Sequence, residues 1–439
     1  MIRRFDIRIA RLVLIGVIGV GILANLMAEP DAATKQQLRR LKSELDDAMR
    51  VADREAITRI STKAATSLGD DAGIPEAPDT LKPVNADTKP LTTEEIRRGF
   101  DRYRQRIPQA RWWKIGLEPT RTPHLPRELA TILDGCLLAR GLNPVHDAEL
   151  LKEARDIGDF LKWAQKQGGR GCYPFPAARN QKGRPFEVAE QFLRKAEADG
   201  KLDELIHQGW VIDDLDDGGL QFDNGLAGVA MFHLAEATGN AEYRQSAIQA
   251  ADWAISRRIV TNWNYNSFSV YLLAEAFRVT NDRKYLESAK SKALLGVIPG
   301  QLRAGKHRGR WADAHNARPA YHYIMIRGLA ALLRVMPAND PDTNTVRECM
   351  QRALLARNPD FQRGILNAES TVEALWQIHQ LSPDQRTALG DCQIPLVWQQ
   401  LERTTAEGMR AGRYPLSPGA MAAILRFLAD SRPLPASEK

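Results

Sequence analysis

The richest concentration of carboxylates is a short acidic run in the middle of the sequence. It contains Asp213, Asp214, Asp216 and Asp217, and Asp223 follows closely. Hydrolysis of a glycosidic bond requires two carboxyl groups beside the bond, one protonated and one charged. Carboxylates that are crowded together raise one another's pKa, which supplies the protonated partner. We therefore predict catalytic roles for Asp214, Asp217 and Asp223.

The same run is open to other interpretations. Clustered carboxylate oxygens suit Ca²⁺, although Leu215 stands where an EF-hand would need a ligand. The run could equally be a solvated loop in which Asp223 or Asn224 caps the next helix. Residues 214–217 also spell the DxDD string of class II terpene cyclases, but the repeated Gln-Trp motifs of that family are missing. The cofactor is therefore either none or Ca²⁺.

A second group of reactive side chains combines positive charge, a histidine and aromatic rings. Guanidinium forks bind carboxylates through paired hydrogen bonds, so the arginines suit a uronate. The histidine, a tyrosine or an arginine could act as the base in β-elimination beside such a carboxylate. The predicted members are Arg310, Trp311, Asp313, His315, Arg318 and Tyr321.

Flat aromatic side chains lie in the loops near these groups. Trp263 and Tyr265 alternate with Asn264 and Asn266, and Tyr173 lies in another loop. A ring face with a neighbouring amide fits a sugar, which has an apolar face and a polar edge. The alternative is that the rings simply fill the interior of the fold. We predict Trp263, Tyr265 and Tyr173 as substrate-binding residues.

The elements that must position these residues are repeated helical hairpins. The segment LAEATGNAEYRQSA (234–247) resembles LAEAFRVTNDRKYLESA (273–289), and Thr238 and Tyr243 have the same separation as Thr280 and Tyr285. Each unit is an apolar helix, a short polar turn and an amphipathic helix. Recurrence of such units is typical of stacked or circular hairpins, and we predict an all-α fold.

The two kinds of connection between these helices differ. Turns within the hairpins are short, whereas the connections between hairpins are long and rich in aromatic and charged residues. In a ring of hairpins, alternate connections meet on one rim. We therefore expect the first helix of each hairpin inside the ring and the functional site on the rim formed by the long loops. His233, which lies among apolar residues on a first helix, is predicted to be a core residue.

The hairpin sequences resemble those of a known group of enzymes. FDNGLAGVAMFHLAEATGNAEYRQSAIQAADWAI is similar to an inner–outer hairpin of the (α/α) toroid enzymes that act on carbohydrates. FLKWAQKQGGRGCYPFP resembles the outer-helix ending and Gly-rich loop of pectate-lyase-type toroids. The resemblance covers about residues 127–429 and implies an (α/α) toroid that acts as a six-hairpin glycosidase or an all-α polysaccharide lyase. It implies no specific reaction.

The N-terminus predicts attachment to a membrane. MIRRFDIRIAR carries four arginines and is followed by the uncharged run LVLIGVIGVGILANLMA. Basic residues stay on the cytoplasmic side, which places the rest of the chain outside. We expect a signal-anchor, or a cleaved signal peptide, over 1–28. A helical stalk with a weak coiled-coil pattern over 29–66, a Pro- and Asp-rich linker over 67–90 and the toroid over 91–435 should follow.

Composition excludes several functions. The net charge of +7 is mild for 439 residues and the basic residues are scattered, so no nucleic-acid partner is expected. No two of the four cysteines have CxxC spacing, and no zinc signature, phosphate loop or nucleophile elbow is present. We expect buried thiols, although an outside location would permit disulfides.

Two hypotheses from different classes follow. One is an extracytoplasmic glycoside hydrolase or polysaccharide lyase that acts on a glycan, for which the arginines favour acidic sugars. The other is a non-catalytic toroid that binds a glycan or a partner protein at the cell envelope. Fold alone does not separate them, because function depends on the site. The expected partners are a glycan, the inner membrane through the N-terminal helix, and a second copy through the stalk.

The location can be tested directly. Protease added to spheroplasts should digest the domain, because the arginine-flanked run places it outside the inner membrane. Immunoblotting of the chain measures the digestion, with a cytoplasmic protein as the control. Full protection of the chain would contradict the predicted orientation.

Overall fold

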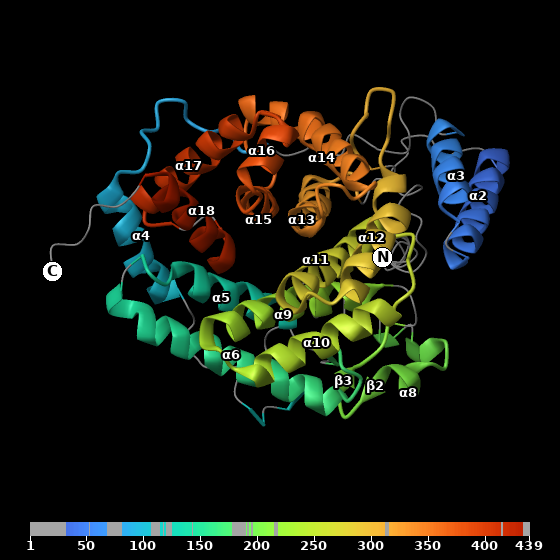
Figure 1. Cartoon of the computed structure of the whole chain (residues 1–439), viewed down its shortest axis with the longest axis horizontal. Coiled ribbons are helices and arrows are strands. Elements are labelled where there is room, and N and C mark those ends of the chain that lie inside the picture. Colours follow the sequence, from blue (N-terminus) through green and yellow to red (C-terminus); the bar gives the residue numbers. More distant parts are fainter. Residues whose placement is uncertain are drawn as a thin grey trace, which may run out of the picture.

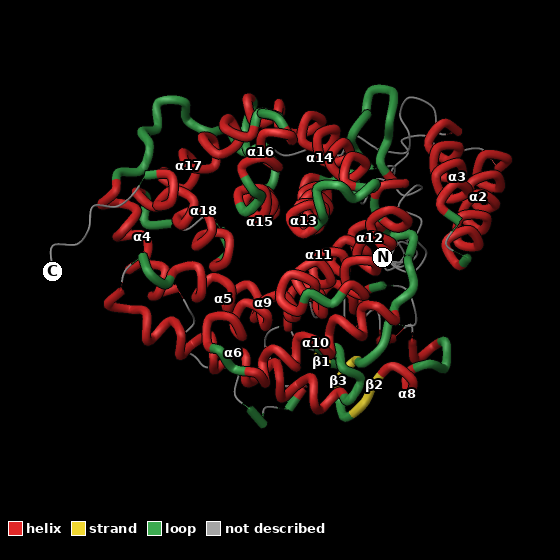
Figure 2. The backbone as a smooth tube through the Cα atoms, viewed as in Figure 1, coloured by secondary structure: helices red, strands yellow, loops and turns green. Residues whose placement is uncertain are grey.

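The computed structural model describes most of the chain. The described residues are 32–51, 53–67, 81–106, 115–116, 118–119, 125–142, 144–177, 190, 193–194, 196–214, 218–311, 316–413 and 416–432. Helices account for nearly all regular structure in these ranges (Figure 2). The predicted all-α class is confirmed for this part of the chain.

Six helices form a closed inner ring. Each packs on the next, and the last helix packs on the first (Figure 1). The apolar character of these helices explains their place, because a helix that is apolar on most sides must be buried. In ring order they are α5 (Pro126–Ala139), α9 (Gly219–Thr238), α11 (Trp263–Thr280), α13 (Pro319–Val335), α15 (Ala368–His379) and α18 (Pro418–Ser431).

A second layer of helices surrounds this ring. The outer helices α10 and α12 follow α9 and α11 in the chain and pack against them. The prediction that the first helix of each of these two hairpins lies inside is therefore confirmed. The outer helices are α4 (Thr93–Arg106), α6 (Asp147–Gly168), α10 (Ala241–Ser256), α12 (Arg283–Gly296), α14 (Thr343–Arg357), α17 (Ile394–Arg410) and the short α16 (Pro383–Leu389).

The sequence repeat has a physical basis in the turns. Thr238 and Thr280 each donate a hydrogen bond to the carbonyl four residues earlier, at 2.7 and 2.6 Å. The hydroxyls of Tyr243 and Tyr285 each donate at 2.9 Å to an aspartate on the preceding outer helix. The repeated residues therefore end each inner helix and join neighbouring outer helices.

The inner helices run in the same direction, since each is joined to the next through an outer helix. Their N-terminal halves accordingly contact one another: Arg127 near the start of α5 meets Asp223 near the start of α9. All inner N-termini thus lie at one face of the ring, which we call the mouth. The described parts of the long connections between hairpins lead into these N-termini, as the sequence predicted.

Smaller elements complete the described chain. Two-residue strands β1 (Phe175–Pro176), β2 (Ile206–His207) and β3 (Trp210–Val211) form an antiparallel sheet of order β1-β3-β2, which the sequence did not suggest. Short helices are η2 (Pro144–His146), α8 (Leu202–Leu205), η3 (Ile298–Gly300) and η4 (Asn358–Gln362). The four cysteines are buried, and none of them forms a disulfide.

The N-terminal region is described only from residue 32. Helices α2 (Ala32–Arg50) and α3 (Arg54–Ser67) pack against each other, and α3 also contacts η3 and α12. The expected anchor over 1–28 lies outside the described residues. Among those residues, none of the helices combines the length and apolar character that a membrane crossing needs. The division of residues 1–90 into anchor, stalk and linker stays a prediction.

Close approach of the inner helices can be tested at Gly225. A Cβ there would lie 2.7 Å from the backbone oxygen of Phe268, so Gly225→Ala should force α9 and α11 apart. We expect a loss of about 1–3 kcal/mol in the free energy of unfolding, measured by urea denaturation. Gly99→Ala is the control, because its closest neighbours are flexible ends of Met409 and Leu425. Equal effects of the two substitutions would contradict the packing argument.

Candidate active site on the ring axis

Three of the predicted catalytic residues cannot be placed. Asp217, Asp313 and His315 lie outside the described residues, as do the other members of the DxDD string after Asp214. Their roles stay predictions.

The other two predicted carboxylates are held by different arginines. Asp214 is buried; its carboxylate accepts a hydrogen bond from the backbone of Leu220 at 3.2 Å and lies 3.9 Å from Arg257 at the end of α10. Asp223 is also buried and forms a bidentate ion pair with Arg127 of α5. A crowded acid pair, as expected from the sequence, therefore does not describe Asp214 and Asp223. Asp214 shares Arg257 with the adjacent Asp213, to which Arg257 donates a hydrogen bond at 2.9 Å, whereas Asp223 pairs with Arg127.

Three predicted stacking residues form part of the packed interior. Trp311 is fully buried, and its indole N–H donates to the Val297 carbonyl at 2.8 Å. Tyr173 is fully buried and hydrogen-bonds Ser246 at 2.8 Å. Trp263 is only 5% exposed, because Gly300 packs against its ring. The structure uses these rings for packing, which was the alternative open from the sequence.

The remaining predicted binding residues lie near the mouth. Arg318 is exposed and is the N-cap residue of α13, whereas Tyr321 and Arg310 are partly buried. Tyr265 is partly buried in the first turn of α11, and its hydroxyl lies close enough to Arg127 to influence the pKa of that guanidinium. These four residues remain accessible candidates for contact with a ligand.

Two cations flank a pair of stacked rings that joins four of the inner helices. The Arg127 guanidinium lies 3.8 Å from the centre of the Phe222 ring, and Phe222 stacks on Phe268 at 4.1 Å. The Arg327 guanidinium lies 5.3 Å from the centre of Phe268. Each member comes from a different inner helix, so cation–π contacts and ring stacking together link α5, α9, α11 and α13.

Deeper in the ring, polar side chains from non-adjacent helices meet. Gln377 of α15 donates a hydrogen bond at 3.0 Å to the Tyr271 hydroxyl of α11, although α13 lies between these helices in the ring. The charge of Asp134 of α5 influences the pKa of both Tyr271 and Glu373 of α15. Side chains can meet in this way only on the ring axis. We call this group the axial cluster: Asp134, His233, Tyr271, Glu275, Arg327, Glu373 and Gln377.

A histidine between two carboxylates forms one part of the axial cluster. His233 Nδ1 lies 2.9 Å from Asp134, and Nε2 lies 3.7 Å from Glu275. Burial opposes the charged imidazole, but Asp134 and Glu275 outweigh burial and raise the pKa of His233 to about 10. Burial also opposes ionisation of Glu275, yet His233, Arg278 and Arg334 lower the pKa of that carboxyl to about 2. Both groups are therefore charged at neutral pH.

Glu373, also in the axial cluster, differs from Glu275 because its pKa is raised rather than lowered. Desolvation raises the pKa of Glu373, and the Arg327 guanidinium at 2.5 Å offsets this only partly. The Glu373 side chain is nevertheless 27% exposed, the same fraction as Asp134. The carboxyl of Glu373 is therefore partly accessible although its surroundings desolvate it. Asp134 and Glu373 are thus both partly accessible, and they lie close enough on the axis for the charge of Asp134 to influence the pKa of Glu373.

A hydrogen-bonding group in the cluster is left unsatisfied. Gln377 is 4% exposed, and its carbonyl oxygen has no hydrogen-bond partner among the described residues. A buried amide oxygen without a partner costs free energy unless a ligand or a water donates to it. It therefore provides an acceptor for a hydroxyl group beside Glu373.

Sequence reasoning missed the axial cluster, and His233 is not the core residue that it predicted. A signal was present: each of five inner helices carries isolated polar residues in an otherwise apolar run. Burying such a residue is costly unless it is paired or faces a site. The runs are ATILDGCLLA, VAMFHLAEA, SVYLLAEAF, IMIRGLAALL and TVEALWQIH.

Metal binding has little support in the described part of the chain. No group of three or more His, Cys, Asp or Glu side chains there is arranged to hold a metal ion. The acidic residues 216 and 217, for which Ca²⁺ was considered, lie outside that part.

Comparisons with known proteins identify structural relatives only. A chain named as a polysaccharide lyase is similar at 11% identity and a TM-score of 0.47, covering 76% of this chain and 96% of the other. A glycosyl hydrolase family 88 protein from Bacteroides vulgatus is similar at 12% identity and a TM-score of 0.45, covering 76% and 97%. The resemblance expected from the sequence is thus found among solved structures. No protein-family model and no curated protein matches the sequence.

The charge of His233 predicts a pH dependence of stability. A pKa raised from 6.5 to about 10 on folding contributes stability that is complete below pH 6.5 and is lost as pH rises through about 10. His233→Gln should remove this decline between the two values, as measured by thermal unfolding at stepped pH. His207→Gln, at an exposed position, is the control. Parallel curves for wild type and His233→Gln across this window would contradict the assignment.

Proposed function

We propose that this protein is an extracytoplasmic carbohydrate-active enzyme, and that the axial cluster hydrolyses a glycosidic bond. The observation that carries the proposal is the meeting of Asp134 and Glu373 on the ring axis. The two carboxyls come from non-adjacent helices, are equally accessible and differ in their surroundings. Titratable groups whose surroundings differ in this way are candidates for an acid–base pair.

Glu373 is the proton donor in this proposal. Desolvation raises the pKa of Glu373 above its ordinary value, which favours the protonated form that a general acid needs. Arg327 fixes the position of Glu373 and is itself held against the rings of Phe268 and Tyr271. The donor is therefore oriented before a ligand arrives.

Asp134 supplies the negative charge. Its partner His233 is an imidazolium that Glu275 also holds, so the carboxylate is fixed on the side that faces the axis. Such a carboxylate serves as base toward water, or as nucleophile toward the sugar. The Tyr271 and Gln377 pair beside it offers hydrogen bonds to sugar hydroxyls.

The mouth favours an acidic glycan. Six inner helices direct their N-termini there, and these carry partial positive charge. The exposed Arg318 adds formal positive charge at the same face. A uronate-containing chain that approaches the axis therefore meets favourable potential before it reaches Asp134 and Glu373.

Hydrolysis has more support than elimination in the described residues. β-Elimination needs a base that can accept a proton near neutral pH. Burial keeps the pKa of Tyr271 well above its usual value, and His233 is already protonated. His315, Tyr321 and Arg318 stay candidates for a lyase reaction at the rim.

We further propose that residues 1–28 anchor the enzyme in the inner membrane with the ring outside, and that the stalk supports weak self-association. These proposals follow from the arginine-flanked apolar run and the leucine spacing in the sequence. A non-catalytic glycan- or protein-binding toroid is the alternative, and a terpene-cyclase-like reaction is a remote one.

The purified protein should be assayed on a panel of neutral and uronate polysaccharides. Glu373→Gln and Asp134→Asn should each lower kcat by roughly 10²–10⁴-fold, because each removes one partner of the acid–base pair. Wild-type activity should decline as pH rises through the raised pKa of Glu373, since the donor then loses its proton. Glu287→Gln on the exposed face of α12 is the matched control.

Several outcomes would contradict this proposal. Equal activity of Glu373→Gln and Glu287→Gln would exclude Glu373 as the donor. Loss of activity only in Asp217→Asn or His315→Ala would move the chemistry to the rim, and an unsaturated uronate product would identify a lyase. Wild type that is inactive on the whole panel and binds no glycan by calorimetry would favour a structural envelope protein.

A further inference from the structure

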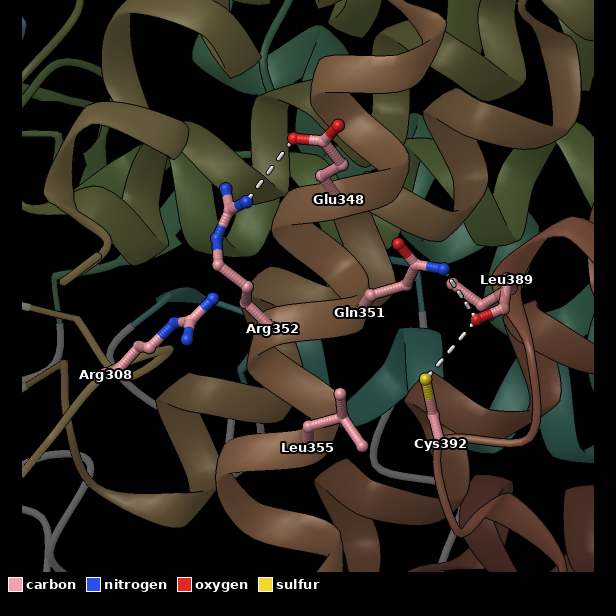
Figure 3. Close-up of a pocket in the computed structure, with 7 residues that line it drawn as sticks. All are labelled: Arg308, Glu348, Gln351, Arg352, Leu355, Leu389 and Cys392. Carbon is pink, nitrogen blue, oxygen red and sulfur yellow. Dashed lines mark hydrogen bonds and ion pairs between the residues drawn. The ribbon is translucent and has the colours of Figure 1, made fainter. Parts of the chain in front are cut away.

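An open pocket lies on the outer layer of the ring, away from the axial cluster. It has a volume of about 540 Å³, which is within the range of small-molecule sites. It lies between the loop after η3, the C-terminal half of α14 and the turn that follows α16 (Figure 3). The lining residues are Arg308, Glu348, Gln351, Arg352, Leu355, Leu389 and Cys392.

One wall of the pocket is a rigid basic loop. Residues 301–311 fold back on themselves, with Leu302 and Gly309 joined by a backbone hydrogen bond of 2.8 Å. Gln301 bonds the carbonyl of Cys349 at 2.9 Å, which fastens the loop to α14. Gly309 lies so close to α14 that a Cβ would come within 2.2 Å of the Arg352 carbonyl oxygen. The separation of Arg308 from α14 is therefore fixed.

Two guanidinium groups face the same space. Arg352 is held in place by Gln301 at 3.0 Å and by Glu348 at 3.5 Å. Arg308 points toward Arg352 from the loop (Figure 3), and its guanidinium has no partner among the residues that the structure describes. The loop 301–311 contains no acidic residue that could neutralise it. An unpaired cation beside a positioned one forms a site for an anion.

The remaining wall is apolar. Leu355 is 54% exposed on α14, which is unusual for a leucine, and it borders the pocket together with Leu389 and Cys392. Gln351 on the same helix donates its amide hydrogens to the carbonyls of Ala388 and Leu389, so it holds this wall in place. A ligand for the pocket needs a negative group at one edge and an apolar face. A sugar acid has both, because the C–H face of its ring is apolar and its carboxylate lies at the edge.

We propose that this pocket is a second, non-catalytic binding site for an acidic sugar residue, with the carboxylate between Arg308 and Arg352 and the sugar face on Leu355. The choice of a glycan rests on the proposed function. α14 ends at the mouth face, since its C-terminus leads through η4 to the start of α15. A chain bound in the pocket would therefore lie on the flank of the mouth.

Binding can be measured without catalysis in the full chain carrying Glu373→Gln. The probe is tetragalacturonate, with its fully methyl-esterified form as an uncharged probe of the same shape, and the method is calorimetry. Arg308→Ala should weaken tetragalacturonate binding at least about tenfold, because it removes a charge-assisted hydrogen bond. Arg303→Ala, an exposed cation in the same loop, should weaken it less than about twofold. Leu355→Asn should weaken it several-fold while leaving the charge unchanged.

The outcomes separate this proposal from the proposed function. Equal losses in Arg308→Ala and Arg303→Ala would show a general effect of charge and overturn the pocket. Equal affinity for tetragalacturonate and for its methyl ester would also overturn it. The pocket would likewise be excluded as a sugar site if tetragalacturonate did not bind and anionic phospholipid vesicles bound in a way that Arg308→Ala weakens. Arg308-dependent tetragalacturonate binding by a wild type that degrades no glycan would keep this site while removing the enzymatic proposal.

Discussion

Charged side chains on the axis of the inner ring impose the main constraint on this fold. Helices α5, α9, α11, α13 and α15 pack through apolar surfaces, but each sends at least one titratable or amide side chain toward the centre. Removing a charge from water is costly unless an opposite charge lies next to it. Glu275 satisfies this condition with Arg278 at 2.6 Å and Arg334 at 3.3 Å, so the ring closes around a connected set of ion pairs.

This constraint also separates two kinds of polar group. Glu275 is 1% exposed and fully paired, which suits a structural role. Asp134, His233 and Glu373 retain between 27% and 29% exposure in the same cluster, so part of each remains available to a ligand. The paired groups fix the positions of the accessible ones. Preorganisation of this kind is what acid–base chemistry requires, because the groups need not move when charge develops.

The outer helices stabilise the ring through contacts with one another. Repeated tyrosines join α10 to α6 and α12 to α10, which keeps this side of the ring regular. Beyond α14 the regularity ends, since α16 has only seven residues and the apolar wall beside it is incompletely covered. A second pocket of about 570 Å³ lies between α15, α17 and α18, where Trp398 stacks on Phe427 at 3.7 Å. The open part of the outer layer is therefore the part in which pockets form.

The sequence alone determined the helical class, the hairpin repeat and the inner positions of α9 and α11, because apolar periodicity and turn residues act over short distances. It also indicated that polar loops would meet at one face.

Tertiary structure decided which polar residues share a site. Asp134, Tyr271 and Glu373 are far apart in the chain and meet only when α18 closes the ring onto α5. Burial separated Trp311 and Tyr173, which pack internally, from Tyr265 and Tyr321, which are partly buried in the first turns of α11 and α13 rather than in loops. The pairing of Asp223 with Arg127 likewise depends on contact between two helices, which no local sequence pattern encodes.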